Sequence, residues 1–288
     1  MTRIIDSFAE ISPQYDAAFV DLWGCMHNGL TAYAEAVAAC HAFRAQGGAV
    51  VMLTNAPRPR AVIAEQLIRF NVPADCYDTI ATSGDSARLA LFAGAIGSKV
   101  HHIGEERDLS FFEPLQMVEN PVAITRVPLD EAEGLAVTGL PGDDTPEDWR
   151  ATLLYAKAKG LPLLCANPDV IVDRGDRREY AAGALAGLYT EMGGESLYFG
   201  KPQPAIYDLA RLRLAEIADV PDERIICIGD GIATDIRGAI GEGLDALFVT
   251  GGLAAAETRT RRQPDPEALA AYLAAEQMSP RYAIGFFR

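Results

Sequence analysis

Short apolar runs, each closed by a polar or glycine residue, alternate along this chain with stretches of helical periodicity. Runs this short and rich in branched side chains predict strands buried on both faces of a parallel sheet. These runs cover 17–20, 49–53, 225–228 and 244–249. Apolar positions three or four residues apart predict helices over 34–46, 59–70 and 204–214. The alternation predicts right-handed crossovers and a doubly wound α/β sheet.

The middle of the chain has a different pattern, which predicts a second α/β unit inserted into the first. Its expected strands are 99–103, 134–137 and 162–165, and its expected helix is 146–159. We place the inserted unit at 97–195, so that 1–96 and 196–288 form the other domain. The alanines at 254–256 and those after Pro266 indicate surface helices.

Polar residues follow three of the predicted strands. Asp21, Thr54 and Asp230 each stand at the carboxyl end of an apolar run. Ligand sites in doubly wound sheets lie at that edge, so we expect these side chains to converge there.

Four short motifs carry candidate chemistry, and each also has an ordinary explanation. Asp21, before a Trp-Gly turn, can be a nucleophile or a metal ligand, or simply end a strand. Thr54 and Asn55 can donate hydrogen bonds to phosphoryl oxygens, or form a common turn. Lys201, held against a proline, can neutralise a carboxylate and a phosphoryl group, or be solvated.

The stretch 229–235 has two acids on a Gly-rich loop that opens a helix. Mg²⁺ is bound through a few carboxylates and several waters, so Asp230 can bind the ion and Asp235 can hold one of its waters. A helix-start carboxylate favoured by the helix dipole is an alternative role for Asp235, and the two roles are compatible.

The order of these motifs resembles the haloacid dehalogenase superfamily, whose pattern is Asp-x-Asp-Gly, a strand ending in Thr or Ser, a Lys, and Gly-Asp-x-x-x-[Thr/Ser]-Asp. The chain is similar in particular to subclass IIA, whose Rossmann-like core carries a C2-type α/β cap and which includes pyridoxal phosphate, 4-nitrophenyl and sugar phosphatases. The resemblance covers nearly the whole chain. The phrases that support it are Leu53-Thr54-Asn55, Ala81-Thr82-Ser83, Ala166-Asn167-Pro168-Asp169 and Gly200-Lys201-Pro202-Gln203-Pro204-Ala205-Ile206-Tyr207.

The resemblance implies that Asp21 attacks phosphorus and forms an aspartyl-phosphate. Thr54 and Asn55 would bind the transferring group, and Lys201 would hold the nucleophile and the phosphoryl charge together. Phosphoryl transfer depends mainly on positioning and charge neutralisation, which such residues supply.

The same resemblance implies a Mg²⁺ cofactor. The ion would lie between Asp21, the backbone carbonyl of Trp23, and Asp230, with Asp235 behind it. Asn167 and Asp169 fall where this branch places a cap loop facing the substrate, although Asn-Pro is also a turn signal. The nearby arginines can reach an anionic substrate or form a solvated loop; they are Arg174, Arg177 and Arg178.

Trp23 departs from the family pattern, because phosphatases of the family carry an acid/base Asp at this position. An indole N–H is only a donor and does not titrate usefully. General acid–base help is worth ~10²–10⁴-fold, so a slow or leaving-group-selective phosphatase is expected. His27 is the nearest titratable replacement, but it can equally pack beside the turn formed by Asn28 and Gly29.

Two other functions stay open. An aromatic residue at position 23 also occurs in metal-independent 2-haloacid dehalogenases of the superfamily, but those lack the acidic loop that holds Asp230 and Asp235. The third function is a non-catalytic protein that binds phosphate or another ligand.

Composition limits the partners. A net charge of −15 over 288 residues argues against nucleic acid and anionic membranes. The family resemblance implies a small phosphorylated metabolite as substrate. A homodimer is expected only by analogy.

The five cysteines show no Cys-x-x-Cys spacing, which indicates neither a zinc site nor a disulfide framework, and only Cys25 lies near the proposed site. The first residues are no signal peptide, so a cytoplasmic protein is expected.

Overall fold

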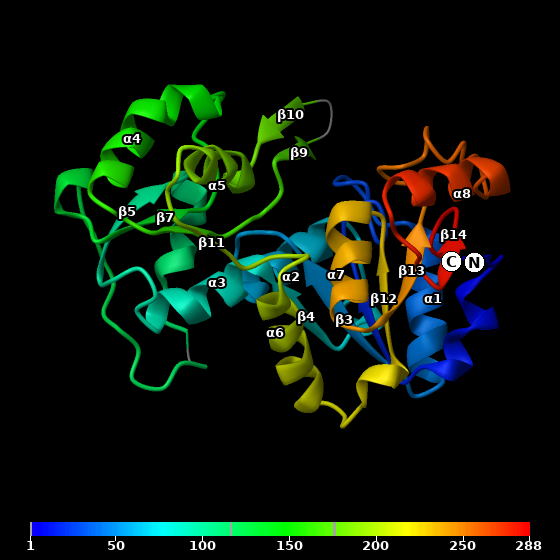
Figure 1. The fold of residues 1–288 in the computed structure, drawn as a ribbon. Helices are drawn as coiled ribbons and strands as arrows, with labels where there is room; N and C mark the ends of the chain where they lie inside the picture. Colours follow the sequence, from blue (N-terminus) through cyan, green and yellow to red (C-terminus); the bar gives the residue numbers. More distant parts are fainter. Residues whose placement is uncertain (1, 116, 175–176) are drawn as a thin grey trace. The chain divides into compact units, whose positions relative to one another are not determined.

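The computed structural model describes residues 2–115, 117–174 and 177–288. Contacts between residues group the chain into two units. The first unit contains Met1–Thr54, Ile63–Ala81 and Tyr207–Arg288, and the second contains Asn55–Val62 and Thr82–Ile206. Each unit has its own sheet, and the second is formed mainly by the cyan-to-green part of the chain (Figure 1). The expected domain boundaries at 97 and 195 stay a prediction.

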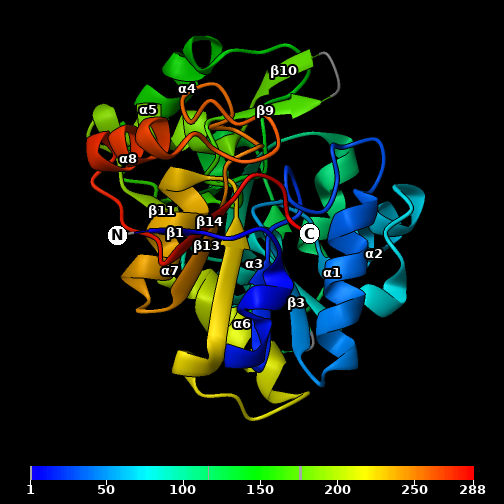
Figure 2. The same cartoon turned by 90° about the vertical axis from the view of Figure 1, so that its right-hand side faces the viewer.

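The first unit has a seven-stranded sheet in the order β1-β14-β13-β12-β2-β3-β4. The pairings from β1 to β3 are parallel. Figure 2 shows β1, β14 and β13 side by side. The strands are β1 (Arg3–Ile4), β2 (Ala17–Val20), β3 (Ala49–Thr54), β4 (Thr79–Thr82), β12 (Ile225–Gly229), β13 (Asp245–Val249) and β14 (Tyr282–Ile284).

Every residue of β2, β3 and β12 is buried, as the uninterrupted apolar runs predict. In the register of these strands Val20 pairs with Ile228 and with Met52. The carboxyl ends of β2 and β12 are therefore level, and the next polar residues of both strands emerge at one edge. This register positions the candidate site.

The helices of this part of the chain are α1 (Ala34–Ala45), α2 (Arg60–Arg69), α6 (Pro204–Ala215), a π-helical turn (Ile232–Ile236), α7 (Arg237–Gly241) and α8 (Pro266–Ala275). The first residues of α2 and α6 belong to the second unit. The predicted helices at 34–46, 59–70 and 204–214 are confirmed within two residues at each end. The prediction of a helix at 254–256 is wrong: these residues form turns, because Gly251 and Gly252 precede them and no helical run follows.

The second unit has a five-stranded parallel sheet in the order β11-β8-β7-β5-β6. Its strands are β5 (Lys99–Ile103), β6 (Thr125–Arg126), β7 (Gly134–Val137), β8 (Leu163–Cys165) and β11 (Ser196–Tyr198). An antiparallel pair is formed by β9 (Ile171–Arg174) and β10 (Arg177–Tyr180). Its α-helices are α3 (Ser83–Phe92), α4 (Arg150–Ala158) and α5 (Ala182–Glu191).

Alternate residues of β7 enter different hydrophobic clusters. Leu135 and Val137 pack with residues of α4 and α5, whereas Ala136 packs with residues of α3. Helices therefore cover both faces of the sheet, as a two-sided burial pattern requires. The predicted helix over 146–159 is shorter than expected, because Pro146–Trp149 form a 3₁₀ turn before α4 begins.

The α/β class with parallel sheets and flanking helices is confirmed. None of the helices in the described part of the chain is long and apolar enough to cross a membrane.

Candidate active site

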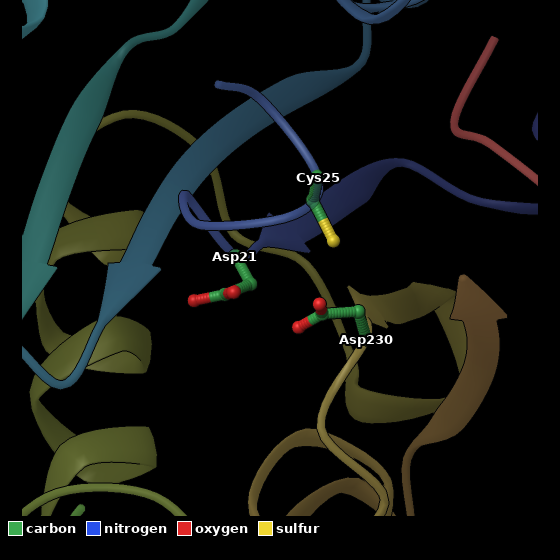
Figure 3. A group of neighbouring side chains, drawn as sticks. All are labelled: Asp21, Cys25 and Asp230. Carbon is green, nitrogen blue, oxygen red and sulfur yellow. The ribbon is translucent and has the colours of Figure 1, made fainter. Parts of the chain in front are cut away.

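Two strand-end carboxylates of the first unit lie next to each other. The backbone N–H of Asp21 donates to the carbonyl of Ile228 at 2.8 Å, which continues the pairing of β2 with β12 by one residue. Asp230 follows β12 directly. One donor atom each of Asp21, Asp230 and Cys25 lies within 4.8 Å of the other two, and all three residues are buried. Figure 3 shows the Asp230 carboxylate directed toward Asp21, with the Cys25 sulfur above the Asp230 carboxylate.

Two glycines enclose the carboxylate of Asp230. A Cβ at Gly24 or at Gly252 would collide with this carboxylate, and Gly24 also has a φ of +73°. The backbone N–H of Leu253 donates to Oδ2 of Asp230 at 3.0 Å. The loops after β2 and β13 therefore fix the orientation of Asp230, and glycine is required for this close approach.

Asp235 organises the loop that follows Asp230. Its Oδ2 accepts hydrogen bonds from the backbone N–H of Gly231 at 3.1 Å and from the Thr234 hydroxyl at 3.3 Å. A Cβ at Gly229 would collide with the Asp235 side chain, so this position also requires glycine. Asp235 is buried in the π-helical turn, and it lies outside the group of three donor residues.

The donor set fits a divalent cation. Like charges repel strongly when they are removed from water, so two buried carboxylates this close favour a cation between them. Hard oxygen donors suit Mg²⁺, and Asp21 and Asp230 supply them. Asp21 and Asp230 therefore form a candidate cation site at the carboxyl edge of the sheet of the first unit.

The indole of Trp23 is held in one orientation. Its ring and the His27 ring form an edge contact with centroids 5.2 Å apart. A Cβ at Gly29, whose φ is +83°, would collide with the indole. The Trp23 side chain is nevertheless 37% exposed. The loop after β2 therefore carries a partly exposed indole two residues after Asp21. At this position the family pattern has a carboxylate.

The environment of His27 favours packing over proton transfer. Only 2% of His27 is exposed, and its ring also contacts Phe70 with centroids 4.9 Å apart. The backbone N–H of Gly29 donates to Nδ1 at 3.1 Å, so this nitrogen already has a proton facing it. Burial lowers the pKa of His27 to about 4. The imidazole is therefore neutral near pH 7 and is a poor replacement for an acid/base carboxylate.

A second group of predicted residues lies in the second unit, around Asn55. Its Oδ1 accepts from the backbone N–H of Lys201 at 2.7 Å. Its Nδ2 donates to the Lys201 carbonyl at 3.2 Å and to Oδ1 of Asp169 at 2.8 Å. Both hydrogens of the Asn55 amide are therefore used to hold Lys201 and Asp169. The sequence did not predict this positioning role; the predicted contact of Asn55 with the transferring group stays a prediction.

The Asn-Pro-Asp loop belongs to the same group. The backbone N–H of Asp169 donates to Oδ1 of the buried Asn167 at 2.9 Å, which is a local Asn turn. A Cβ at Gly200 would collide with Pro168 and approach Oδ1 of Asn55 closely. The Asn-Pro-Asp segment therefore forms the turn that the sequence allowed. The Asp169 side chain also accepts a hydrogen bond from Asn55.

Lys201 is 2% exposed, which rules out the alternative of a solvated lysine, and its peptide bond to Pro202 is cis. Thr54 ends β3 and is also buried. The side chains of Arg174, Arg177 and Arg178 lie outside the described residues.

Sequence reasoning missed the glycines around Asp230, although the Thr-Gly-Gly that ends the run at 244–249 was a signal for a close backbone approach.

Comparison with known families gives two matches. Residues 18–117 match the family described as haloacid dehalogenase-like hydrolase, and residues 198–275 match the family described as HAD-hydrolase-like. The first range contains Asp21, Thr54 and Asn55, and the second contains Lys201 and Asp230.

Known relatives agree with these matches. A crystal structure of a hydrolase of the haloacid dehalogenase-like family from Brucella suis 1330 is 35% identical, with a TM-score of 0.85, and the match covers 99% of this chain and 100% of that one. The chain therefore belongs to the haloacid dehalogenase-like hydrolase family. The predicted family and enzyme class are confirmed.

Two further relatives carry more specific names. Dihydroxyacetone phosphatase of Corynebacterium glutamicum (strain R) is 32% identical over 106 residues, which are 36% of this chain and only 37% of that protein. Glycerol phosphate phosphatase of Mycobacterium tuberculosis, crystallised with magnesium, is 24% identical with a TM-score of 0.64, over 86% of this chain and 71% of that one. The second likeness concerns the fold.

Proposed function

We propose that this protein is a Mg²⁺-dependent phosphomonoester hydrolase that acts through an aspartyl-phosphate at Asp21. The observation that carries the proposal is the buried pair of Asp21 and Asp230, whose donor atoms lie within 4.8 Å of each other. A 2-haloacid dehalogenase that attacks carbon needs no cation, so it does not need a second carboxylate to hold one. Phosphoryl transfer uses it, because a cation held there offsets the charge of nucleophile and phosphate.

Each residue of the site has a role in this proposal. Asp21 attacks phosphorus, and the leaving alcohol departs with the electrons of the broken P–O bond. Asp230 and the Trp23 carbonyl would hold the cation together with Asp21, and Asp235 keeps the Asp230 loop in place through Gly231 and Thr234. Bound Mg²⁺ supplies positive charge to the phosphoryl oxygens.

The remaining residues bind the phosphoryl group. The Thr54 hydroxyl donates a hydrogen bond to a phosphoryl oxygen. The Lys201 ammonium group offsets the negative charge of the phosphoryl group. Asn55 serves mainly by orienting Lys201 and Asp169, which its amide already holds. Positioning of this kind is where most of the catalysis in phosphoryl transfer originates.

Trp23 makes the expected enzyme slow for ordinary alkyl phosphates. No side chain at this position protonates the leaving oxygen or activates the water that cleaves the aspartyl-phosphate. His27 is a poor substitute, because it is buried and its pKa is lowered to about 4. Substrates with good leaving groups need no proton for the first step, so they should react fastest.

The proposed substrate is a small phosphorylated metabolite. Two relatives are named for three-carbon phosphates, dihydroxyacetone phosphate and glycerol phosphate. Three-carbon phosphates are therefore the first compounds to test, followed by sugar phosphates and pyridoxal phosphate. Asp169 and Asn167 are the proposed contacts to the substrate's carbon skeleton.

The test is a phosphatase screen over these compounds and 4-nitrophenyl phosphate, run with Mg²⁺ and with excess EDTA. We expect phosphate release with Mg²⁺ that EDTA abolishes. Asp21→Asn should abolish turnover, whereas Asp219→Asn, the same change at an exposed position of the first unit, should not. Turnover of a 2-haloacid in EDTA would overturn the proposal in favour of a dehalogenase. Absence of any hydrolysis would favour a protein that only binds phosphate.

A further inference from the structure

Cys25 adds a sulfur donor to the two carboxylates of the candidate cation site. Its Sγ belongs to the same group as the Asp21 and Asp230 oxygens, each within 4.8 Å of the others. Figure 3 shows the sulfur directed toward the Asp230 carboxylate. Among the described residues, the other four cysteines belong to no comparable group of possible ligands. Among the cysteines of the described residues, Cys25 is therefore the one whose sulfur lies among possible metal ligands.

The chemistry of sulfur changes which ions the site can select. Mg²⁺ prefers oxygen ligands and keeps several waters, so it has no use for a thiolate. Zn²⁺ binds cysteine sulfur and carboxylate oxygen together, and three protein ligands plus one water are common around it. Two carboxylates and one thiolate provide that number of ligands.

A cavity of about 400 Å³ lies beside Cys25, which forms part of its wall. Its wall includes Gly24 and Cys25, together with Tyr33, Glu35, Phe286 and Phe287. A water molecule occupies roughly 30 Å³ of liquid, so the cavity has room for an ion with part of its hydration shell. The acidic Glu35 favours a cation there. An ion can thus approach Cys25 through residues of the first unit alone.

We propose that Asp21, Cys25 and Asp230 bind a thiophilic divalent cation, represented by Zn²⁺, in competition with Mg²⁺. The thiol loses its proton to solvent when the ion binds, and the resulting thiolate donates the sulfur lone pair. This inference shares the metal site of the proposed function, but ion binding can be measured without any substrate. Zn²⁺ at this site excludes Mg²⁺ and so opposes the proposed hydrolysis.

The experiment is an optical titration of the metal-free, full-length protein with Co²⁺, a coloured probe for zinc sites. Ligation by Cys25 produces a sulfur-to-cobalt charge-transfer band in the ultraviolet that saturates at one equivalent and disappears when Zn²⁺ is added. Calorimetry then gives the affinities for Zn²⁺ and for Mg²⁺. The variants are Cys25→Ser and a matched control, Cys227→Ser, at another buried cysteine of the first unit.

We expect the band in the wild type and in Cys227→Ser, and its loss in Cys25→Ser. The Zn²⁺ affinity of Cys25→Ser should fall by at least about tenfold, since even outer contacts of a metal site are worth ~10–100-fold. Its Mg²⁺ affinity should change by less than about twofold, because a hard ion does not use the sulfur.

A wild-type protein that binds Co²⁺ without the sulfur band overturns the inference, whether or not the variants fold. A band that persists in Cys25→Ser does the same. Failure of the proposed function looks different: the band appears, but no phosphoester is hydrolysed with Mg²⁺.

Discussion

The two groups of polar residues in this protein differ in the contacts that hold their side chains in place. In the first unit, Asp21 and Asp230 are like charges held together by backbone and glycine contacts. In the second unit, Asn55, Lys201 and Asp169 are complementary partners joined by hydrogen bonds of 2.7 to 3.2 Å. Close backbone packing around Asp230 therefore shapes the first group, whereas the Asn55 amide holds the second together. We infer that the first selects the cation and the second positions a lysine.

The largest expected effect concerns the acid/base carboxylate that the first group lacks, because Trp23 stands at its position. Trp23→Asp restores an acid/base carboxylate, so turnover of alkyl phosphates should rise by ~10²–10⁴-fold. Steady-state kinetics with glycerol phosphate measure this change. Trp23→Asn is the matched control, since it has the same size but does not titrate, and it should give no comparable gain. Equal gains in both variants would show that removing the indole, not adding a carboxylate, accelerates the reaction.

The next effect tests the enclosure of Asp230. Gly24→Ala places a Cβ against the Asp230 carboxylate, so the Mg²⁺ affinity should fall by ~10–100-fold. Gly47 is the matched control, because its φ is also positive, at +93°, but a Cβ there meets nothing within 4 Å. Both alanines should lose about 1–2 kcal/mol of stability from the left-handed backbone. Calorimetric titration with Mg²⁺ separates them, and equal Mg²⁺ affinities would contradict the proposed role of the glycine.

The second group should respond in stability more than in metal binding. Asp169→Ala leaves one hydrogen of the Asn55 amide without its acceptor, which should cost about 1–3 kcal/mol of unfolding free energy. Asp169→Asn keeps an oxygen that can accept this hydrogen bond, so it should recover most of the loss. Chemical denaturation measures both, with Mg²⁺ affinity as the second readout. Equal losses in the two variants would mean that the hydrogen bond contributes little.

Features that depend on residues close together in the sequence could be predicted, whereas features that depend on residues far apart in the sequence could not. The strands at 17–20 and 225–228 were predicted because uninterrupted apolar runs need no distant information. Strands β1 and β14 were missed, since two or three residues carry no periodicity. The hydrogen bond between Asn55 and Asp169 joins residues 114 positions apart, so no local pattern reveals it.

The same holds for the site. The sequence predicted Asp21 and Asp230 as neighbours because parallel strand ends share an edge. It did not show that Gly24 and Gly252 close around Asp230, because that contact depends on three loops. It left His27 between catalysis and packing, and the buried position of the ring favours packing.

The last expected effect lies outside both groups and concerns His27 and pH. Its pKa in the folded protein is about 4, below the usual 6.5, so the folded state binds its proton less readily than the unfolded state. The stability contribution is complete above pH 6.5 and is lost as the pH falls toward 4, by up to about 3 kcal/mol. Urea denaturation across this range measures the loss. His27→Gln should remove this part of the pH dependence and leave the pH profile of turnover unchanged; a lost limb in that profile would restore His27 as an acid.

The most direct test of the account is chemical trapping of the intermediate. The protein is mixed with 4-nitrophenyl phosphate and Mg²⁺, quenched in acid within a single turnover, and digested for mass spectrometry. Trp23 cannot activate the hydrolytic water, so we predict a nitrophenolate burst and a phosphoryl group on the peptide that contains Asp21. Both should diminish in Trp23→Asp, which hydrolyses the intermediate faster. Release of nitrophenolate with Mg²⁺ but without a burst or a phosphorylated Asp21 peptide would contradict the account.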